Sequence, residues 1–147
     1  MTLEQELSVY QPANEQEARD LPQMLAFLRT GATPFERANE TAHFTASAWV
    51  VGRETGKVLL IYHNIYRSWA WTGGHADGET DLRAVARREA MEESGVSGLR
   101  DLGDGPLSIE ILTVDGHEKR GRYVSSHLHY NVTYLFEADD RQAVHMK

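Results

Sequence analysis

The sequence predicts a mixed α/β or α+β domain, and three observations lead to this prediction. The chain has 147 residues, which suits one domain with one hydrophobic core. Hydrophobic residues make up 41% and charged residues 25%, the usual balance of a globular protein. Helical and strand periodicities follow one another as helix, strands, one strong helix and more strands. We expect a single domain over residues 1–147, with an N-terminal helical segment in residues 1–35.

The first predicted helix spans residues 14–30. Its apolar side chains recur at helical spacing and form one stripe, which predicts a helix that packs on the core. Pro22 either begins a second helical segment or kinks the helix, and Gly31 ends it. The stripe consists of Leu21, Met24, Leu25 and Leu28.

Strands are predicted next. Residues 44–51 and 57–63 flank a glycine-containing turn at residues 52–56, a pattern typical of a β-hairpin. In the second half, residues 107–114 form one candidate strand. Residues 127–138 alternate between apolar and polar side chains, which predicts a strand with one buried face. Its apolar positions are Leu128, Tyr130, Val132, Tyr134 and Phe136, and its polar positions are His127, His129, Asn131 and Thr133.

Residues 81–94 form the strongest predicted helix. Thr80 or Asp81 can cap its start, and Gly95 occupies the position of a left-handed C-terminal cap. Leu82, Val85, Ala86 and Ala90 share one apolar face.

Charge and composition exclude several classes of function. A formal net charge of -7 and a sequence pI of about 5.4 disfavour duplex nucleic acid as a partner, because such binding depends on a basic surface. The chain contains no cysteine, which excludes disulfides and thiolate sites and fits a cytoplasmic protein. No apolar run approaches the roughly 20 residues that a membrane span needs, so we expect no membrane partner.

Three glutamates gather at the end of the strongest helix, where negative charge is least favourable. Glu89, Glu92 and Glu93 follow the spacing that places carboxylates on one helix face. They repel one another and face the negative end of the helix dipole. Arg88 can pair with Glu92, but this pair compensates only one charge. A hard divalent cation would offset the repulsion, whereas the alternative is a solvated acidic face.

Gly73 and Gly74 precede this helix and allow the backbone to approach a ligand, or they form a plain tight turn. With them the stretch resembles the signature of the Nudix hydrolases. Two positions depart from it, since Thr80 replaces the fixed glutamate, with Glu79 one place early, and Ala90 is small for an aliphatic position. The matching residues are Gly74, Arg88, Glu89, Glu92, Glu93, Gly95 and Val96.

The resemblance implies an α/β/α sandwich around a mixed β-sheet. It also implies hydrolysis of a diphosphate linkage in a small nucleoside-diphosphate-type compound, assisted by Mg²⁺ or Mn²⁺. Glu89, Glu92, Glu93 and the Gly73 carbonyl would be the metal ligands, and Arg88 would hold a glutamate in place. Glu92 or Glu93 can act as the catalytic base, although in this family a downstream loop often supplies it. The alternative function is a noncatalytic ligand-binding module on the same scaffold.

Histidines and aromatic residues supply further candidates. Gly74, His75 and His129 are candidates for binding a phosphate or carboxylate of the substrate. Trp71, with Trp69 and Tyr66, is placed to stack on a base or to pack on the sheet. The His127–Leu128–His129 stretch raises the alternative of a histidine-based zinc hydrolase, which lacks a clear third ligand and leaves the glutamates unexplained.

The family fold implied by the resemblance adds a strand and a helix after residue 138. Only residues 139–147 follow here. We expect either a shortened chain or coverage of that sheet face by the helix of residues 14–30, which is compatible with a homodimer. Asp139 and Asp140 are weak substitutes for a carboxylate from a missing segment.

Overall fold

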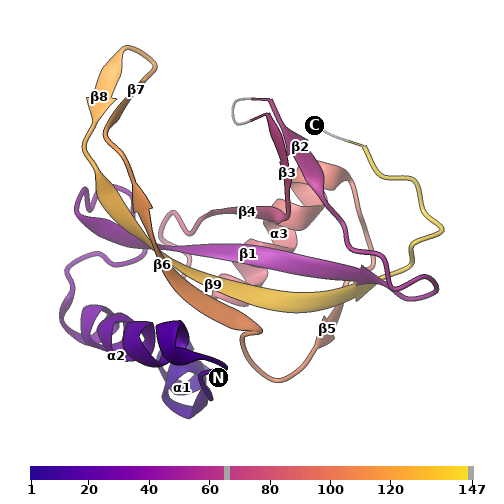
Figure 1. Cartoon of the computed structure of the whole chain (residues 1–147), viewed down its shortest axis with the longest axis horizontal. Helices are drawn as coiled ribbons and strands as arrows, with labels where there is room; N and C mark the ends of the chain where they lie inside the picture. Colours follow the sequence, from indigo (N-terminus) through magenta and orange to yellow (C-terminus); the bar gives the residue numbers. More distant parts are fainter. Residues whose placement is uncertain (65–66, 146–147) are drawn as a thin grey trace.

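The protein is built on a mixed five-stranded sheet. The computed structural model describes residues 1–64 and 67–145. The strands are β1 (Ala42–Gly52), β4 (Thr72–His75), β5 (Arg100–Leu102), β6 (Ser108–Val114) and β9 (His127–Ala138). β4, β1, β9 and β5 are neighbours in that order, and β6 also pairs with β9 (Figure 1). β1 and β9 are parallel and the other pairs are antiparallel, which confirms the predicted mixed α and β fold with a mixed sheet.

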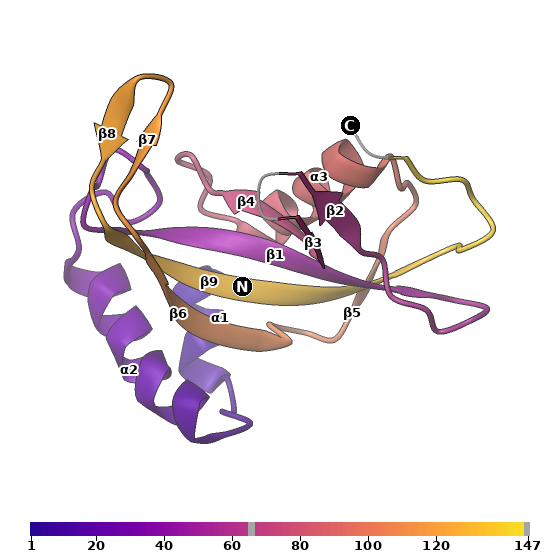
Figure 2. The same ribbon diagram turned by 45° about the horizontal axis from the view of Figure 1, so that its top comes forward.

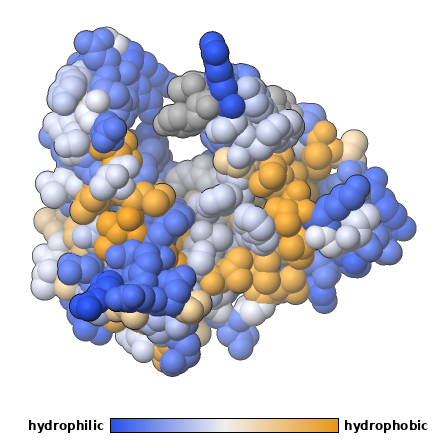
Figure 3. Space-filling model, viewed as in Figure 1, coloured by the Kyte–Doolittle hydropathy of each residue, from blue (hydrophilic) through white to orange (hydrophobic). Residues whose placement is uncertain are grey.

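Two small hairpins project from the sheet. β2 (Ile61–His63) pairs with β3 (Ser68–Ala70), and β7 (His117–Lys119) pairs with β8 (Arg122–Val124). Both hairpins rise on the same side of the sheet in the two ribbon views (Figures 1 and 2). The β7–β8 hairpin presents a hydrophilic surface at the upper left of Figure 3.

The predicted hairpin of residues 44–51 and 57–63 is only partly correct. The turn forms, and its arms are joined by the Val51–Val58 bridge and by hydrogen bonds from the Gly52 N–H to Lys57 and from the Leu59 N–H to Val50, but the pairing does not extend to residues 61–63. The free edge of β1 is instead occupied by β4, from the Thr45–His75 pair to the Ala48–Thr72 pair. Because that edge is taken, β2 diverges and pairs with β3.

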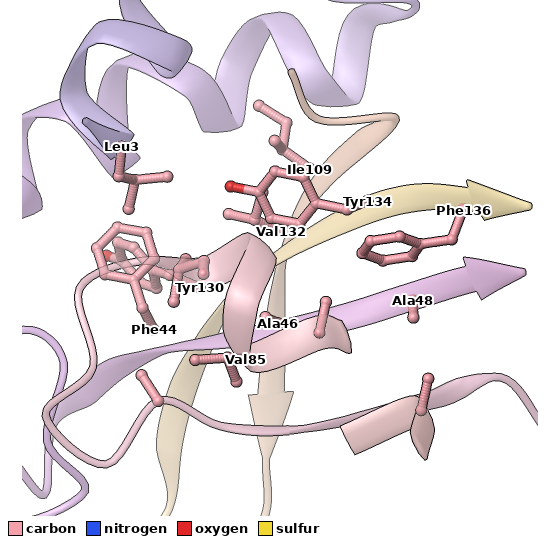
Figure 4. Packing of buried hydrophobic residues seen from close by; sticks show 14 of the residues in the cluster. Leu3, Phe44, Ala46, Ala48, Val85, Ile109, Tyr130, Val132, Tyr134 and Phe136 are labelled. Carbon is pink, nitrogen blue, oxygen red and sulfur yellow. The ribbon is translucent and has the colours of Figure 1, made fainter. Parts of the chain in front are cut away.

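The two faces of the sheet differ in chemistry. Alternation along β1 and β9 places apolar side chains on one face, here called the core face, and polar side chains on the other, called the polar face. Tyr134, Phe136 and Phe44 are among the largest fully buried side chains, which confirms the predicted apolar face of β9. Figure 4 shows Phe44, Ala46, Ala48, Tyr130, Val132, Tyr134 and Phe136 in this core.

Three helices contribute to the same core. α1 (Leu3–Val9) and α2 (Glu15–Thr30) lie together beside β6, and α3 (Leu82–Ser94) lies beside β1 and β4 (Figures 1 and 2). Phe27 of α2 packs against Tyr130, with 4.6 Å between ring centroids. Leu7 of α1 and Val85 of α3 are fully buried in the same cluster.

α2 begins and ends where the sequence predicts. The side chain of Asn14 accepts a hydrogen bond from the Glu17 N–H, and Gly31 follows the last helical residue. Pro22 lies within a continuous helix. α2 also protects an edge of the sheet, because the carboxylates of Glu17 and Asp20 accept hydrogen bonds from two N–H groups of β6, at 3.0 and 3.1 Å.

α3 agrees closely with its prediction. Asp81 caps its start by accepting a hydrogen bond from the Ala84 N–H, and Gly95 ends it in the left-handed conformation, with φ of 75°.

The sequence does not predict α1 or the short strands β4, β5, β7 and β8. Residues 139–145 contain no helix or strand. Among the described residues, none of the helices is both long and apolar enough to cross a membrane.

Candidate active site

The glycines of β4 and the glutamates of α3 meet at the edge of the sheet. The N–H of Gly73 donates a hydrogen bond of 3.0 Å to Glu93 Oε1. A Cβ atom on Gly74 would lie 2.5 Å from Glu89 Cδ, and one on Gly73 would lie 2.7 Å from Ser47 Oγ. Both positions therefore require glycine for close approach, and both lie in a strand rather than in a tight turn.

The backbone of Gly73 also places a carbonyl at this edge. In an antiparallel ladder the N–H and C=O of one residue point to the same side of the strand. The N–H of Gly73 points away from β1 and toward Glu93, so the Gly73 carbonyl faces the same outer edge. The strand thus offers one donor to a carboxylate and directs one carbonyl to the same edge.

The glutamates carry poorly compensated negative charge. Burial raises the pKa of the Glu89 carboxyl, and repulsion from Glu93 and Glu92 raises it further. Burial also raises the pKa of Glu93, against the opposing effect of the hydrogen bond from Gly73. Glu92 is exposed on the same turn. This arrangement favours a proton or a cation among the three carboxylates.

Arg88 lies beside this cluster, whereas Thr80 and Glu79 lie at the other end of α3, before its first residue. Arg88 Nη2 is 4.0 Å from Glu89 Oε1, and the Arg88 side chain is 44% exposed, so the contact is a weak ion pair. This contact joins Arg88 to Glu89 rather than to Glu92. Thr80 is exposed, and Glu79 accepts a hydrogen bond of 2.9 Å from the Asp81 N–H at the start of α3.

The histidines form a second cluster on the polar face. His75 lies on β4 opposite Thr45, and His129 lies on β9 beside His43 of β1. One ring nitrogen of each of these three histidines lies within 4.8 Å of the others. His127 adjoins them, with its Nε2 3.2 Å from His129 Nε2. The sequence identified His75, His127 and His129 but missed His43, whose place depends on the parallel pairing of β1 with β9.

The clustered imidazoles are neutral at physiological pH. Burial lowers the pKa of His75 to about 4, with smaller contributions from Arg37 and His43. Burial lowers the pKa of His129 to about 3, with contributions from His75 and His43. Burial likewise lowers the pKa of His43, against its hydrogen bond to the backbone of Asn39. Each ring therefore keeps one nitrogen lone pair.

A cavity of about 390 Å³ opens above the histidines. The β7–β8 hairpin forms one wall, and cationic side chains from three segments line the space. They are Arg37, which is paired with Asp77 at 2.6 Å, Lys119 and Arg122, and Glu40 adds one carboxylate to the lining. Such a lining suits an anionic ligand, although the chain as a whole is acidic.

Polar and aromatic side chains continue along the polar face away from the histidines. Asn131 Oδ1 accepts hydrogen bonds from Thr45 and Ser47, at 2.9 and 3.1 Å. Trp71 is 40% exposed and packs edge-on against Trp49, with 5.7 Å between ring centroids. Tyr66 lies outside the described residues.

Asp139 and Asp140 are engaged elsewhere. Asp140 accepts hydrogen bonds from the N–H groups of Glu54 and Thr55 and so holds the turn after β1. Asp139 pairs with Arg141 at 2.9 Å. Both carboxylates thus have structural contacts near the turn.

The mixed α and β fold is the one that the resemblance to the Nudix hydrolases implies. The NUDIX domain matches residues 41–145, which is more than two thirds of the 147 residues. The chain therefore belongs to the NUDIX domain family, and its general activity is that of a pyrophosphohydrolase. No curated protein matches the sequence significantly.

Several solved structures are similar to this chain over 71% of its length. They include a C. elegans Ap4A hydrolase in a binary complex (20% identity, 72% of that chain, TM-score 0.44). A NUDIX family hydrolase from Clostridium perfringens gives 20% identity over 73% of its chain, with a TM-score of 0.47. The E. coli dihydroneopterin triphosphate pyrophosphohydrolase gives 13% identity over 73% of its chain, with a TM-score of 0.48. The family assignment rests on the domain match and not on these distant likenesses.

Proposed function

We propose that this protein hydrolyses a diphosphate linkage in a small nucleoside-diphosphate-type compound, with Mg²⁺ or Mn²⁺ as its metal. The observation that supports the proposal is the placement of two mutually repelling carboxylates of α3 against the glycines of β4: Glu93 accepts from the Gly73 N–H, and Glu89 packs against Gly74, with Glu92 on the same helix turn. Glu89 and Glu93 are partly buried near one another, and their repulsion lowers the stability of the folded state unless a cation binds beside them.

The donor atoms fit a hard divalent cation. Carboxylate and carbonyl oxygens are the ligands that Mg²⁺ and Mn²⁺ prefer. Glu89, Glu92, Glu93 and the Gly73 carbonyl supply such oxygens from one helix turn and one strand. When bound, the metal neutralises phosphate oxygens and lowers the pKa of a coordinated water.

The residues of the chain would orient this chemistry. The Gly73 N–H fixes one oxygen of Glu93. Glu92 is exposed on the same turn and can accept the proton of the attacking water, and Glu93 is the second candidate for this role. Arg88 lies beside Glu89 and would position its carboxylate.

Substrate recognition would use the polar face. Gly74 keeps β4 free of a side chain where the diphosphate must approach Glu89. His75 and His129 line the cationic cavity and can donate to an anionic group of the substrate. The exposed ring of Trp71 offers a stacking surface for a base. A homodimer and a cytoplasmic location stay predictions from the sequence.

A panel of nucleoside diphosphate derivatives tests the proposal directly. Product release should be measured with purified protein in Mg²⁺, in Mn²⁺ and after chelation. We expect hydrolysis of at least one compound with either metal and none after chelation. The alternative, a noncatalytic binding module, predicts saturable binding of a compound in the panel without turnover under any metal condition.

A further inference from the structure

Three histidine rings from different strands meet at one place on the polar face. The ring centroids of His43, His75 and His129 are 5.0 to 5.2 Å apart in every pair. They come from three adjacent strands, and their register is fixed by the ladders β1–β4 and β1–β9. The sheet itself therefore brings the three imidazoles to one point.

His43 is the most informative member, because only 3% of its surface is exposed. Its Nδ1 lies 3.0 Å from the carbonyl oxygen of Asn39, so Nδ1 carries the proton and donates to that oxygen. The lone pair then lies on Nε2, a buried atom without a hydrogen-bond partner in the described structure. A ring fixed by a backbone carbonyl, with its other nitrogen unused, is the usual arrangement of a metal-binding histidine.

We propose that His43, His75 and His129 bind a divalent transition-metal ion of the zinc class. Three imidazole nitrogens suit Zn²⁺, Co²⁺ or Ni²⁺ and not Mg²⁺, which prefers oxygen. Zinc–nitrogen bonds of 2.0–2.1 Å at tetrahedral angles place ligand nitrogens about 3.3 Å apart. The present spacing, within 4.8 Å, requires a modest approach of the three rings on binding.

The site is separate from the carboxylate site, and binding of zinc does not depend on the proposed hydrolysis. β4 connects the two, since Gly73 adjoins Glu93 and His75 adjoins the histidines two residues later. The fourth coordination position faces the cavity that contains Arg37 and Lys119, where water or an anionic group can reach it. His127, whose Nε2 is 3.2 Å from His129 Nε2, is the nearest further nitrogen.

Metal uptake by the purified full-length chain tests the inference. Protein stripped with a chelator should be dialysed against Zn²⁺ in the presence of excess Mg²⁺, and the bound zinc quantified. We expect one zinc per chain, and substitutions His75→Ala and His129→Ala should each weaken its affinity by at least about 100-fold. His117→Ala is the matched control, because His117 lines the same cavity on the exposed hairpin, and it should retain the zinc.

A second measurement covers variants that fail to fold. Co²⁺ bound to the wild-type protein should give the intense visible bands of a four-coordinate nitrogen site rather than the weak bands of an octahedral oxygen site. Glu93→Gln should retain zinc binding, so loss of hydrolysis and loss of zinc are distinguishable. Equal zinc uptake by wild type and the His75→Ala/His129→Ala double variant, or an octahedral cobalt spectrum, overturns the inference.

Discussion

The N–H of Gly73 donates a 3.0 Å hydrogen bond to Glu93 Oε1, joining the edge strand of the sheet to the last turns of α3. The contact orients a carboxylate that would otherwise be free to turn toward solvent. It also requires that no side chain at position 73 pushes β4 away from Ser47. Strand, glycine and glutamate thus form one unit at the edge of the sheet.

Replacing Glu93 by glutamine should abolish most turnover without unfolding the protein. The glutamine oxygen can still accept from Gly73, but it carries no charge to bind a metal or accept a proton. We expect kcat to fall by at least about 100-fold, a typical effect of losing an acid–base or metal-binding group. Steady-state kinetics should be compared with Glu79→Gln, whose exposed carboxylate accepts from the Asp81 N–H at the other end of α3 and whose rate should be unchanged. Equal rates for Glu93→Gln and wild type would remove the carboxylate mechanism.

Gly74→Ala should displace the Glu89 carboxylate. The added Cβ would lie 2.5 Å from Glu89 Cδ, the far end of a flexible side chain that can rotate away. The fold should survive, whereas displacement by about 1 Å of a positioned group can cost up to about 100-fold in rate. Kinetics and a melting curve should be measured for Gly74→Ala and for Gly105→Ala, where the nearest atom is 4.0 Å from the added Cβ. A fully active Gly74→Ala enzyme would contradict the role given to Glu89.

The sequence predicts those parts of the structure that depend on local spacing. α3 follows from the periodicity of Leu82, Val85 and Ala86 and from its two caps, and β9 follows from strict alternation. The same spacing places the glutamates on one helix turn. β7 and β8 have three residues each, too few to show a period. The predicted hairpin is correct only at its turn, because β4 pairs with the edge of β1 that residues 61–63 would otherwise occupy.

The histidine cluster could not be predicted because it depends on strand pairing. His43 and His129 become neighbours through the parallel ladder of β1 and β9, whose register sequence spacing does not reveal. His75 joins them only because β4 takes the other edge of β1. The alternation of His43, Thr45 and Ser47 with apolar residues was the available signal, but it indicates a polar face and not which residues meet there.

In the metal-free protein, Glu89→Gln should increase stability. Burial and the neighbouring carboxylates raise the folded-state pKa of Glu89, so its ionised form disfavours folding at neutral pH. Removing the charge should increase the free energy of unfolding by roughly 0.5–1.5 kcal/mol, from the dipole and like-charge effects together. Thermal melts in chelator should show a rise of about 2–4 °C for each kcal/mol. Glu92→Gln, on the same turn but exposed, should give a smaller rise, and a lower melting temperature for Glu89→Gln would contradict the assigned repulsion.

The stability of the protein should depend on pH through Glu6, which lies on the buried side of α1. Its carboxylate accepts a 3.0 Å hydrogen bond from the Tyr134 hydroxyl and lies 3.6 Å from Arg83, yet burial dominates and raises its pKa above the ordinary value of 4.5.

Because the folded state then binds this proton more tightly than the unfolded state, the contribution of Glu6 is fully present below pH 4.5 and is lost as pH rises through the folded pKa. Glutamine at this position cannot titrate and can still accept from Tyr134. Urea unfolding at a series of pH values from 4 to about 7 should therefore show a smaller loss of stability with rising pH in Glu6→Gln than in wild type. Parallel curves for the two proteins would mean that Glu6 titrates alike in the folded and unfolded states, and that its burial on the inner side of α1 does not govern its charge.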